Sequence, residues 1–235
     1  MDIIGVIGGN GVAATNKLCE LIEYEITKKG AFRDCQHPEI IIWQATQAPS
    51  RSMYLEGKGE SFIPDYIEIA RRLKACGATI LCMCCNTAHY AIDDISQNAD
   101  IPFINLIEGI AQKIKLMNIS TVGLMASDGC CKHKIYDKYF SQICPEINII
   151  YPDKKHQELV TTGICNIKNI HRFDDEISEQ RPKNIFNKVS DYLKMQGAEI
   201  VISGCTDIRV DYYNPSDIDS LEVLKDLILE RVSYE

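Results

Sequence analysis

Two stretches of the chain are alike when one is laid on the other. Residues 73–81 (LKACGATIL) align without a gap on residues 193–201 (LKMQGAEIV), 120 positions later. Four positions beyond the first stretch lies Cys85, and four beyond the second lies Cys205. Near the start, residues 4–7 align on residues 122–125 at an offset of 118. Such self-similarity indicates repeated structural units, so we expect two similar halves.

Apolar segments rich in β-branched residues alternate with segments whose apolar residues recur at helical spacing. We expect strands at residues 3–7, 39–43, 79–84, 121–125, 147–151 and 199–203, and helices at residues 15–28, 62–76 and 185–196. Residues 39–43 are apolar on both strand faces, which is typical of a parallel sheet covered on both sides. The sequence therefore predicts an α/β fold of two tandem domains related by a pseudo-two-fold axis. Each domain has a mainly parallel sheet flanked by helices.

The length of 235 residues accommodates two small domains with real cores. We place the first domain at residues 1–105 plus 211–235 and the second at residues 106–210. A C-terminal helix at about residues 219–233 is expected to return to the first domain.

Charge and composition exclude several classes of protein. Lys and Arg number 25 and Asp and Glu number 33, a net charge of −8, which argues against nucleic acid as the main partner. No apolar run is long enough for a membrane helix, and the N-terminus lacks the basic region of a signal peptide. An odd count of 11 cysteines in a chain of this size does not indicate a disulfide framework. We expect a cytoplasmic protein.

Cys85 and Cys205 each follow a predicted strand, at the end where open α/β sheets place ligand chemistry. A disulfide is disfavoured in a reducing compartment, and a zinc site lacks the close cysteine pairs it usually needs. A thiol nucleophile remains open, because His89 lies four residues after Cys85. The fourth alternative is a pair of acid–base catalysts, in which one thiolate removes a proton from a carbon and the opposite thiol delivers one.

The residues after each cysteine favour the acid–base pair. Asn86 and Thr87 follow Cys85, and Thr206 and Asp207 follow Cys205. Turns of small polar residues offer backbone N–H groups and hydroxyls that suit a carboxylate. A helix that begins just after each turn would also favour the thiolate.

Three motifs together resemble the aspartate/glutamate racemase family. They are residues 5–9 (GVIGG), 85–89 (CNTAH) and 204–207 (GCTD), and residues 49–52 (PSRS) with 57–60 (GKGE) resemble the aspartate racemase branch more closely. The similarity runs from residue 3 to about residue 210. The resemblance implies a racemase that works without pyridoxal phosphate or any other cofactor, on a small amino acid, as a homodimer.

The resemblance also assigns roles by position. Cys85 would act on the D-enantiomer and Cys205 on the L-enantiomer, while Arg51 would pair with a substrate carboxylate. The side chains that would hold the α-carboxylate are Asn86, Thr87, Ser127 and Thr206. The glycine turn would let the backbone approach the substrate closely at Gly9 and Asn10.

Two positions depart from the aspartate racemase pattern. A lysine in the second half of those enzymes contacts a substrate carboxylate, and our register puts Glu158 there, with Lys154 or Lys155 as substitutes if the loop shifts. Arg209 follows the GCTD motif where the family has an apolar or small residue, and it would bind substrate or pair with Glu158. We therefore expect aspartate or glutamate as substrate, with a neutral or basic amino acid as the alternative.

Other functions remain as alternatives. The same resemblance also leaves open a decarboxylase or a cis–trans isomerase of a dicarboxylate. Such relatives often use only one cysteine or use the pair differently, so two thiols count against it. A non-catalytic amino-acid-binding protein of the same fold would bind one enantiomer without turnover. The run Cys130-Cys131-Lys132-His133 lacks the second ligand pair of a zinc site, and the glycines after the first strand do not have the spacing of a dinucleotide loop. Asp207 and His89 are expected to support the cysteines rather than react.

Overall fold

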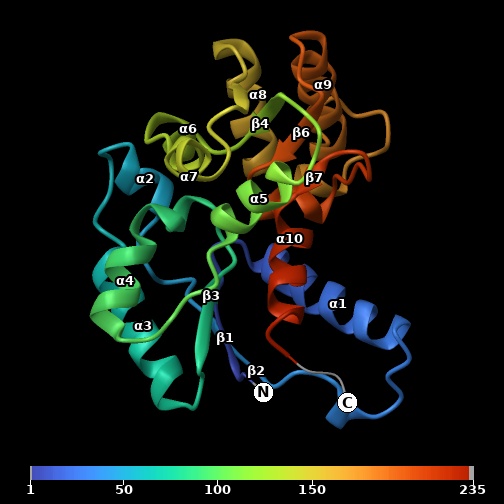
Figure 1. Ribbon diagram of the computed structural model, residues 1–235. Helices are drawn as coiled ribbons and strands as arrows, with labels where there is room; N and C mark the ends of the chain where they lie inside the picture. Colours follow the sequence, from blue (N-terminus) through green and yellow to red (C-terminus); the bar gives the residue numbers. More distant parts are fainter. Residues whose placement is uncertain (1, 233–235) are drawn as a thin grey trace.

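The computed structural model describes residues 2–232, and its seven strands within that range form two parallel sheets. In the first sheet β1 (Ile4–Gly8) lies between β2 (Ile40–Gln44) and β3 (Ile80–Met83). The second sheet has the order β5-β4-β6-β7, with β4 (Thr121–Met125), β5 (Asn148–Ile150), β6 (Ile200–Ser203) and β7 (Ile218–Asp219). All the strand pairs are parallel, and Figure 1 shows one sheet above the other.

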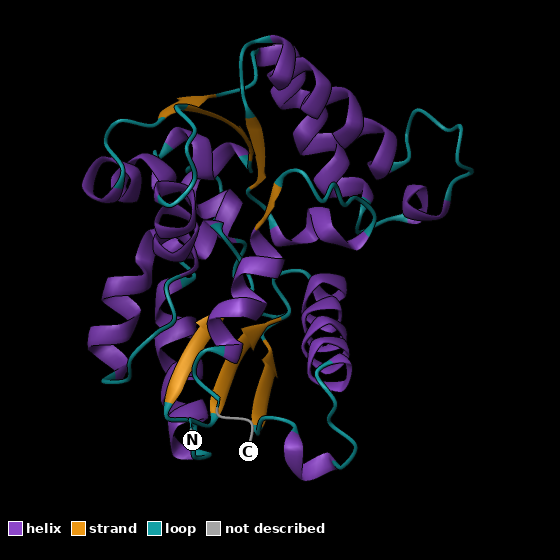
Figure 2. Cartoon of the chain, turned by 45° about the vertical axis from the view of Figure 1, so that its right-hand side comes forward, coloured by secondary structure: helices purple, strands orange, loops and turns teal. Residues whose placement is uncertain are grey.

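Helices lie on both sides of the sheets (Figure 2). The α-helices are α1 (Val12–Lys28), α2 (Arg51–Leu55), α3 (Ile63–Ala75), α4 (Ile92–Ala99), α5 (Leu106–Lys115), α6 (Asp128–Lys132), α7 (Ile135–Ile143), α8 (Lys154–Asn166), α9 (Pro182–Met195) and α10 (Ser220–Leu229). Short 3₁₀ helices are η1 (Asp34–Gln36), η2 (Thr87–Ala91), η3 (Ile170–Phe173) and η4 (Thr206–Val210). The predicted α/β fold of two related halves is confirmed.

The sequence repeat corresponds to the same helix ending used twice. Gly77 follows α3 with φ +108° and Gly197 follows α9 with φ +100°, a conformation that favours glycine. The Ala78 N–H donates to the Leu73 carbonyl, and the Ala198 N–H donates to the Leu193 carbonyl, at 3.1 Å each. These bonds are those of the Schellman motif, which turns the chain from each helix into the next strand.

A glycine in each central strand completes the repeated unit. A side chain at Gly5 would overlap Leu81 and Ala78, and one at Gly123 would press on Leu193 and Ala198. The helix and the strand that follows it therefore approach the central strand equally closely in both halves. The packing explains why the glycines and the Leu-to-Ala segments repeat together.

The two halves share one core. A single cluster of buried side chains connects the facing sides of the two sheets, including Val6 of β1 and Leu124 of β4. Two helices connect the halves. Helix α5 follows the strands of the first sheet in the chain and packs on α7, and α10 follows the strands of the second sheet and packs on α1 and α5. Separate clusters fill the outer sides, under α3 and α4 in one half and under α8 and α9 in the other. The exact division at residues 105/106 and 210/211 stays a prediction.

The turns after the two cysteines differ from the expected helix starts. Both begin with a 3₁₀ turn, in which the His89 N–H donates to the Asn86 carbonyl and the Ile208 N–H to the Cys205 carbonyl. An α-helix, α4, then follows η2, but none follows η4 directly. Within residues 2–232, no helix combines the length and apolar character that a bilayer crossing requires.

Candidate active site

The two cysteines of the repeat occupy equivalent places and lie in one region. Cys85 is the second residue after β3 and Cys205 the second after β6. Both are partly exposed, whereas Cys84 is fully buried. The Thr206 hydroxyl donates to the Cys84 carbonyl at 3.0 Å, so the two turns contact each other across the halves. The charge of Cys85 is close enough to raise the pKa of Cys205.

Cys205 is held as a neutral thiol. Its pKa is raised far above the ordinary value, first by burial and then by the carboxylate of Asp207, while the ammonium of Lys168 acts in the opposite direction. The protonated thiol of Cys205, in the same region as the thiol of Cys85, can serve as a proton donor.

His89 positions the turn of Cys85 and does not serve as its base. The Leu106 N–H donates to His89 Nε2 at 3.1 Å, so Nδ1 carries the proton and donates to the Cys85 carbonyl at 2.9 Å. Burial lowers the pKa of His89 to about 4, which keeps the ring neutral. Both ring nitrogens are therefore occupied by backbone groups.

Arg51 directs a positive charge at Cys85. Its guanidinium donates to the carbonyl oxygens of Asn10 at 3.1 Å and Pro49 at 3.4 Å. Among the described residues no carboxylate lies within ion-pair distance of it. Burial acts to lower the pKa of Arg51, but the charge of Cys85 and a hydrogen bond to it raise the pKa above its ordinary value. Ser50 caps α2 and so fixes the position of Arg51 at the first turn.

Asp207 pairs with Lys168, a residue that the sequence analysis did not single out. Lys168 Nζ lies 3.0 Å from Asp207 Oδ2, and only 4% of the Asp207 side chain is exposed. The other oxygen, Oδ1, is buried without a hydrogen-bond partner and packs on Gly11, where a Cβ would overlap it. Burial raises the pKa of Asp207, and the ammonium of Lys168 acts to lower it. Burial acts to lower the pKa of Lys168, but the carboxylate of Asp207 raises the pKa above its ordinary value.

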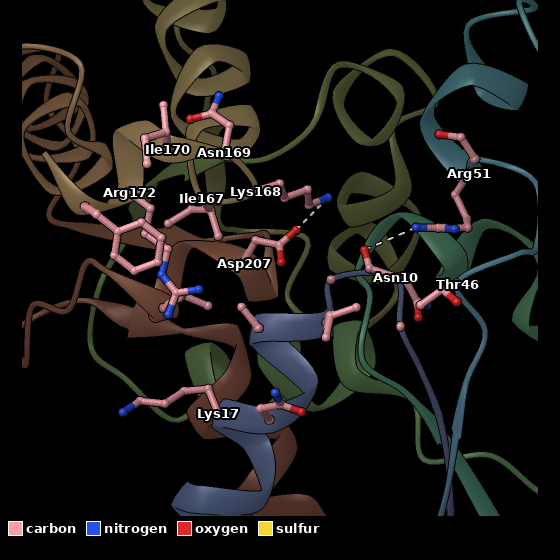
Figure 3. A pocket seen from close by; sticks show the side chains of 18 of the residues that line it. Asn10, Lys17, Thr46, Arg51, Ile167, Lys168, Asn169, Ile170, Arg172 and Asp207 are labelled. Carbon is pink, nitrogen blue, oxygen red and sulfur yellow. Dashed lines mark hydrogen bonds and ion pairs between the residues drawn. The ribbon is translucent and has the colours of Figure 1, made fainter.

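A cavity of about 920 Å³ lies between the halves beside these groups (Figure 3). Four of the predicted site residues line it, namely Gly9, Asn10, Arg51 and Asp207. Figure 3 shows the side chains of Lys168 and Arg51 pointing toward each other from opposite sides. The side-chain amide of Asn10 is buried there, and neither its nitrogen nor its oxygen has a partner in the protein.

Other predicted carboxylate ligands meet at the junction of the halves. Thr87 Oγ1 and Ser127 Oγ are 2.8 Å apart, which joins η2 to the start of α6. The amide of Asn86 is engaged in the interior, because it donates to Ser220 and accepts from the Tyr136 hydroxyl. Thr206 is occupied by the Cys84 carbonyl described above. Like Cys85 and Cys205 themselves, these residues do not line the cavity.

The structure places Glu158 and Arg209 away from the cavity. Glu158 is exposed on α8, as are Lys154 and Lys155 at its start. Arg209 contacts Glu222 at 2.9 Å and Asp219 at 3.0 Å, so its charge is matched by the start of α10 and not by Glu158. The lysine of the second half that reaches the cavity is Lys168, just past the end of α8. The sequence carries no motif around it that would have identified it.

No metal centre is apparent among residues 2–232, where no three His, Cys, Asp or Glu side chains converge as ligands. In the run of residues 130–133, Cys130 is buried, and His133 Nε2 bonds to the Leu55 carbonyl at 2.8 Å. These groups are turned to different neighbours and pack α6 against α2.

Comparison with known proteins identifies the family of this chain. The family model for Asp/Glu/hydantoin racemase matches residues 4–222. The broad-specificity amino-acid racemase RacX of Bacillus subtilis (strain 168) is 23% identical over 208 residues, which cover 88% of this chain and 86% of RacX.

Solved structures show the same fold. The aspartate racemase of Picrophilus torridus superposes with a TM-score of 0.82 at 23% identity, covering 98% of this chain and 94% of that one. Glutamate racemase isoform RacE1 of Bacillus anthracis has a TM-score of 0.69 at 16% identity, covering 98% and 81%. Because the family model spans nearly the whole chain, the protein belongs to the Asp/Glu/hydantoin racemase family and is an isomerase that acts on amino acids.

Proposed function

We propose that the protein interconverts the L- and D-forms of an acidic amino acid, aspartate or glutamate, by proton transfer between Cys85 and Cys205 without a cofactor. The observation that carries the proposal is the equivalent placement of Cys85 and Cys205, each the second residue after a strand, in two turns that a hydrogen bond from Thr206 to the Cys84 carbonyl joins across the halves. Racemisation at a carbon needs a base on one face and an acid on the other. The duplicated turns supply one sulfur each.

In the direction from D to L, the Cys85 thiolate removes the α-proton and the Cys205 thiol delivers its own proton to the opposite face. The electron pair left on the α-carbon takes that proton, so Cys205 ends as the thiolate and Cys85 as the thiol. The reverse direction begins from that state. Each turnover thus exchanges the roles of the two sulfurs and consumes no other reactant.

Polar groups around the thiols fit an amino acid. The hydroxyls of Thr87 and Ser127 lie 2.8 Å apart, and in this proposal they donate to the α-carboxylate. The unpartnered amide of Asn10 offers both a donor and an acceptor to an ammonium and a carboxylate. Arg51, which no protein carboxylate neutralises, would hold the carboxylate of the substrate side chain by its two-pronged guanidinium.

A neutral amino acid remains the second candidate substrate, because Asp207 already compensates the charge of Lys168. The broad specificity in the name of RacX is in keeping with that candidate. We also propose a cytoplasmic homodimer, as the family resemblance implies. Light scattering of the purified protein, with twice the mass of one chain as the expected result, tests the assembly.

Incubation of either enantiomer of aspartate or glutamate in deuterated water tests the mechanism. The wild-type protein is expected to racemise the amino acid and to place deuterium at the α-carbon. Cys85→Ala and Cys205→Ala should each lower the racemisation rate at least about 10²-fold, the typical worth of one acid–base group. Cys205→Ala should still exchange the α-hydrogen of the D-enantiomer without inversion, because Cys85 remains.

Cys165→Ala, at an exposed cysteine on α8, is the matched control and should keep full activity. If both active-site variants racemise as fast as the control, the two-thiol mechanism is wrong.

A further inference from the structure

We infer that Asp207 is a specificity-determining residue. It holds Lys168 in an ion pair and so prevents the lysine from binding the distal group of the substrate, which is the group at the end of the substrate side chain. The site would then accept amino acids with an uncharged distal group as well as acidic ones. This inference rests on the proposed function, since it describes which substrates the same cavity admits.

Arg51 and Lys168, two of the cations that line the cavity, come from opposite halves and have different partners. Arg51 donates to the carbonyls of Asn10 and Pro49 and faces Cys85, and no carboxylate of the described residues lies within ion-pair distance of it. Lys168 contacts a carboxylate at 3.0 Å. Four basic side chains line the cavity, Lys17, Arg51, Lys168 and Arg172, and carboxylates compensate the charges of Lys17 and Lys168. A second carboxylate on the substrate would therefore meet fewer uncompensated cations than the cavity lining contains.

The burial of Asp207 explains why Lys168 cannot simply change partners. The carboxylate is nearly fully buried, and its oxygen Oδ1 has no hydrogen bond and rests on Gly11. If Lys168 turned to the substrate, Asp207 would keep a buried charge with no nearby ammonium. Breaking one partner out of a buried ion pair is costly because the remaining charge is left unpaired. Half of the Lys168 side chain is exposed, so the buried carboxylate is the member that fixes the pair.

The size of the cavity agrees with a permissive site. At about 920 Å³ it is far larger than a free dicarboxylic amino acid needs, and it is also lined by apolar side chains, among them Ile167 and Ile170. A neutral or longer side chain would find both room and apolar surface there.

Binding of DL-aspartate and DL-asparagine, measured by isothermal titration calorimetry, tests the inference. The two molecules have nearly the same shape and differ in the distal charge, and a racemic mixture does not change composition during turnover. The quantity compared is the ratio of the two dissociation constants, asparagine over aspartate. Wild type, Lys168→Met, Asp207→Asn and the double variant are measured, with Lys17→Met as control.

Lys168→Met alone should lower the ratio, because it leaves the buried Asp207 as an uncompensated negative charge. The double variant should keep the ratio within about twofold of wild type, because it removes both charges of a pair that was already compensated. Asp207→Asn should raise the ratio about tenfold by releasing Lys168 to the distal carboxylate, and adding Lys168→Met should abolish that gain. Lys17 also lines the cavity, paired with Glu20 at 2.7 Å, and its variant should behave like wild type.

The inference is overturned if the double variant lowers the ratio about tenfold relative to wild type, if Asp207→Asn alone leaves the ratio unchanged, or if wild type binds neither amino acid. The ratio needs no turnover. A correct pattern of ratios without α-hydrogen exchange would therefore contradict the proposed function and leave the inference standing.

Discussion

Single buried groups decide the protonation of this site. His89 is neutral because both ring nitrogens serve backbone groups in a dry interior, and Cys205 is neutral because burial and Asp207 oppose a thiolate. A histidine four residues after a cysteine is compatible with a catalytic pair. The hydrogen bonds show instead that His89 holds the backbone of Cys85 against the start of α5.

His89 should make the stability of the fold depend on pH. Its pKa is lowered from 6.5 to about 4 by folding, so between these values the unfolded chain binds more protons than the native one. Its contribution is present above pH 6.5 and is lost as the pH falls toward 4. The difference in unfolding free energy between wild type and His89→Asn should shrink by about 2 kcal/mol from pH 7 to pH 5.

Urea denaturation at the two pH values measures that difference, in which the contributions of other groups cancel. An equal difference at pH 7 and pH 5 would show that His89 is not held neutral by the fold.

At the scale of elements, the sequence repeat corresponds to two helices that end in the same way. Helices α3 and α9 end in the same hydrogen-bond pattern, and each leads into a strand that ends two residues before a cysteine. The position of each thiol is thus fixed by a chain of local choices: a left-handed glycine, a short buried strand and a polar turn.

Gly197→Ala should lower the unfolding free energy by about 1–2 kcal/mol, because a residue with a Cβ resists the left-handed region. The space beside Gly197 is empty, so the loss comes from the backbone and not from a clash. Gly77→Ala should cost the same amount, since its φ and surroundings match. Chemical denaturation of both variants checks the symmetry, with Met195→Ala, at an exposed position of α9, as the control. Unequal losses would count against equivalent endings.

At the scale of the whole molecule, the site exists only where the halves meet. The shared core and the helices α5 and α10 hold the two sheets together. Two hydrogen bonds also join the halves, one from the Thr206 hydroxyl to the Cys84 carbonyl and one between the hydroxyls of Thr87 and Ser127. Relative movement of the halves would change the separation of the thiols directly.

Thr206→Val should lower the unfolding free energy by about 1–3 kcal/mol, because the buried Cys84 carbonyl loses its side-chain donor. Racemisation should fall as well, since the junction is loosened beside both cysteines. The matched control is Thr162→Val, whose hydroxyl donates to the Glu158 carbonyl on the exposed side of α8. If the two threonine variants are equally stable and equally active, the bond at the junction does not position the site.

Much of the architecture could be predicted from sequence, because strand and helix periodicity are local. The predicted strand at residues 121–125 coincides with β4, and the other strands agree within a residue or two at each end. The ends differ because the last pairs of a ladder depend on the neighbouring strand. The location of the two cysteines after β3 and β6 followed in the same way.

The sequence by itself determined two α/β halves with a cysteine after a buried strand in each, because the repeated apolar pattern and helix-ending glycines act within a few residues. Only the tertiary structure decided which basic and acidic side chains reach the cavity. Lys168 does so and Glu158 does not, because the packing of α8 on α9 determines which end of the helix faces the first half. Asp207 pairs with Lys168 of the same half, but it is buried against Gly11 of the other half, and a buried charge is stable only beside an opposite one.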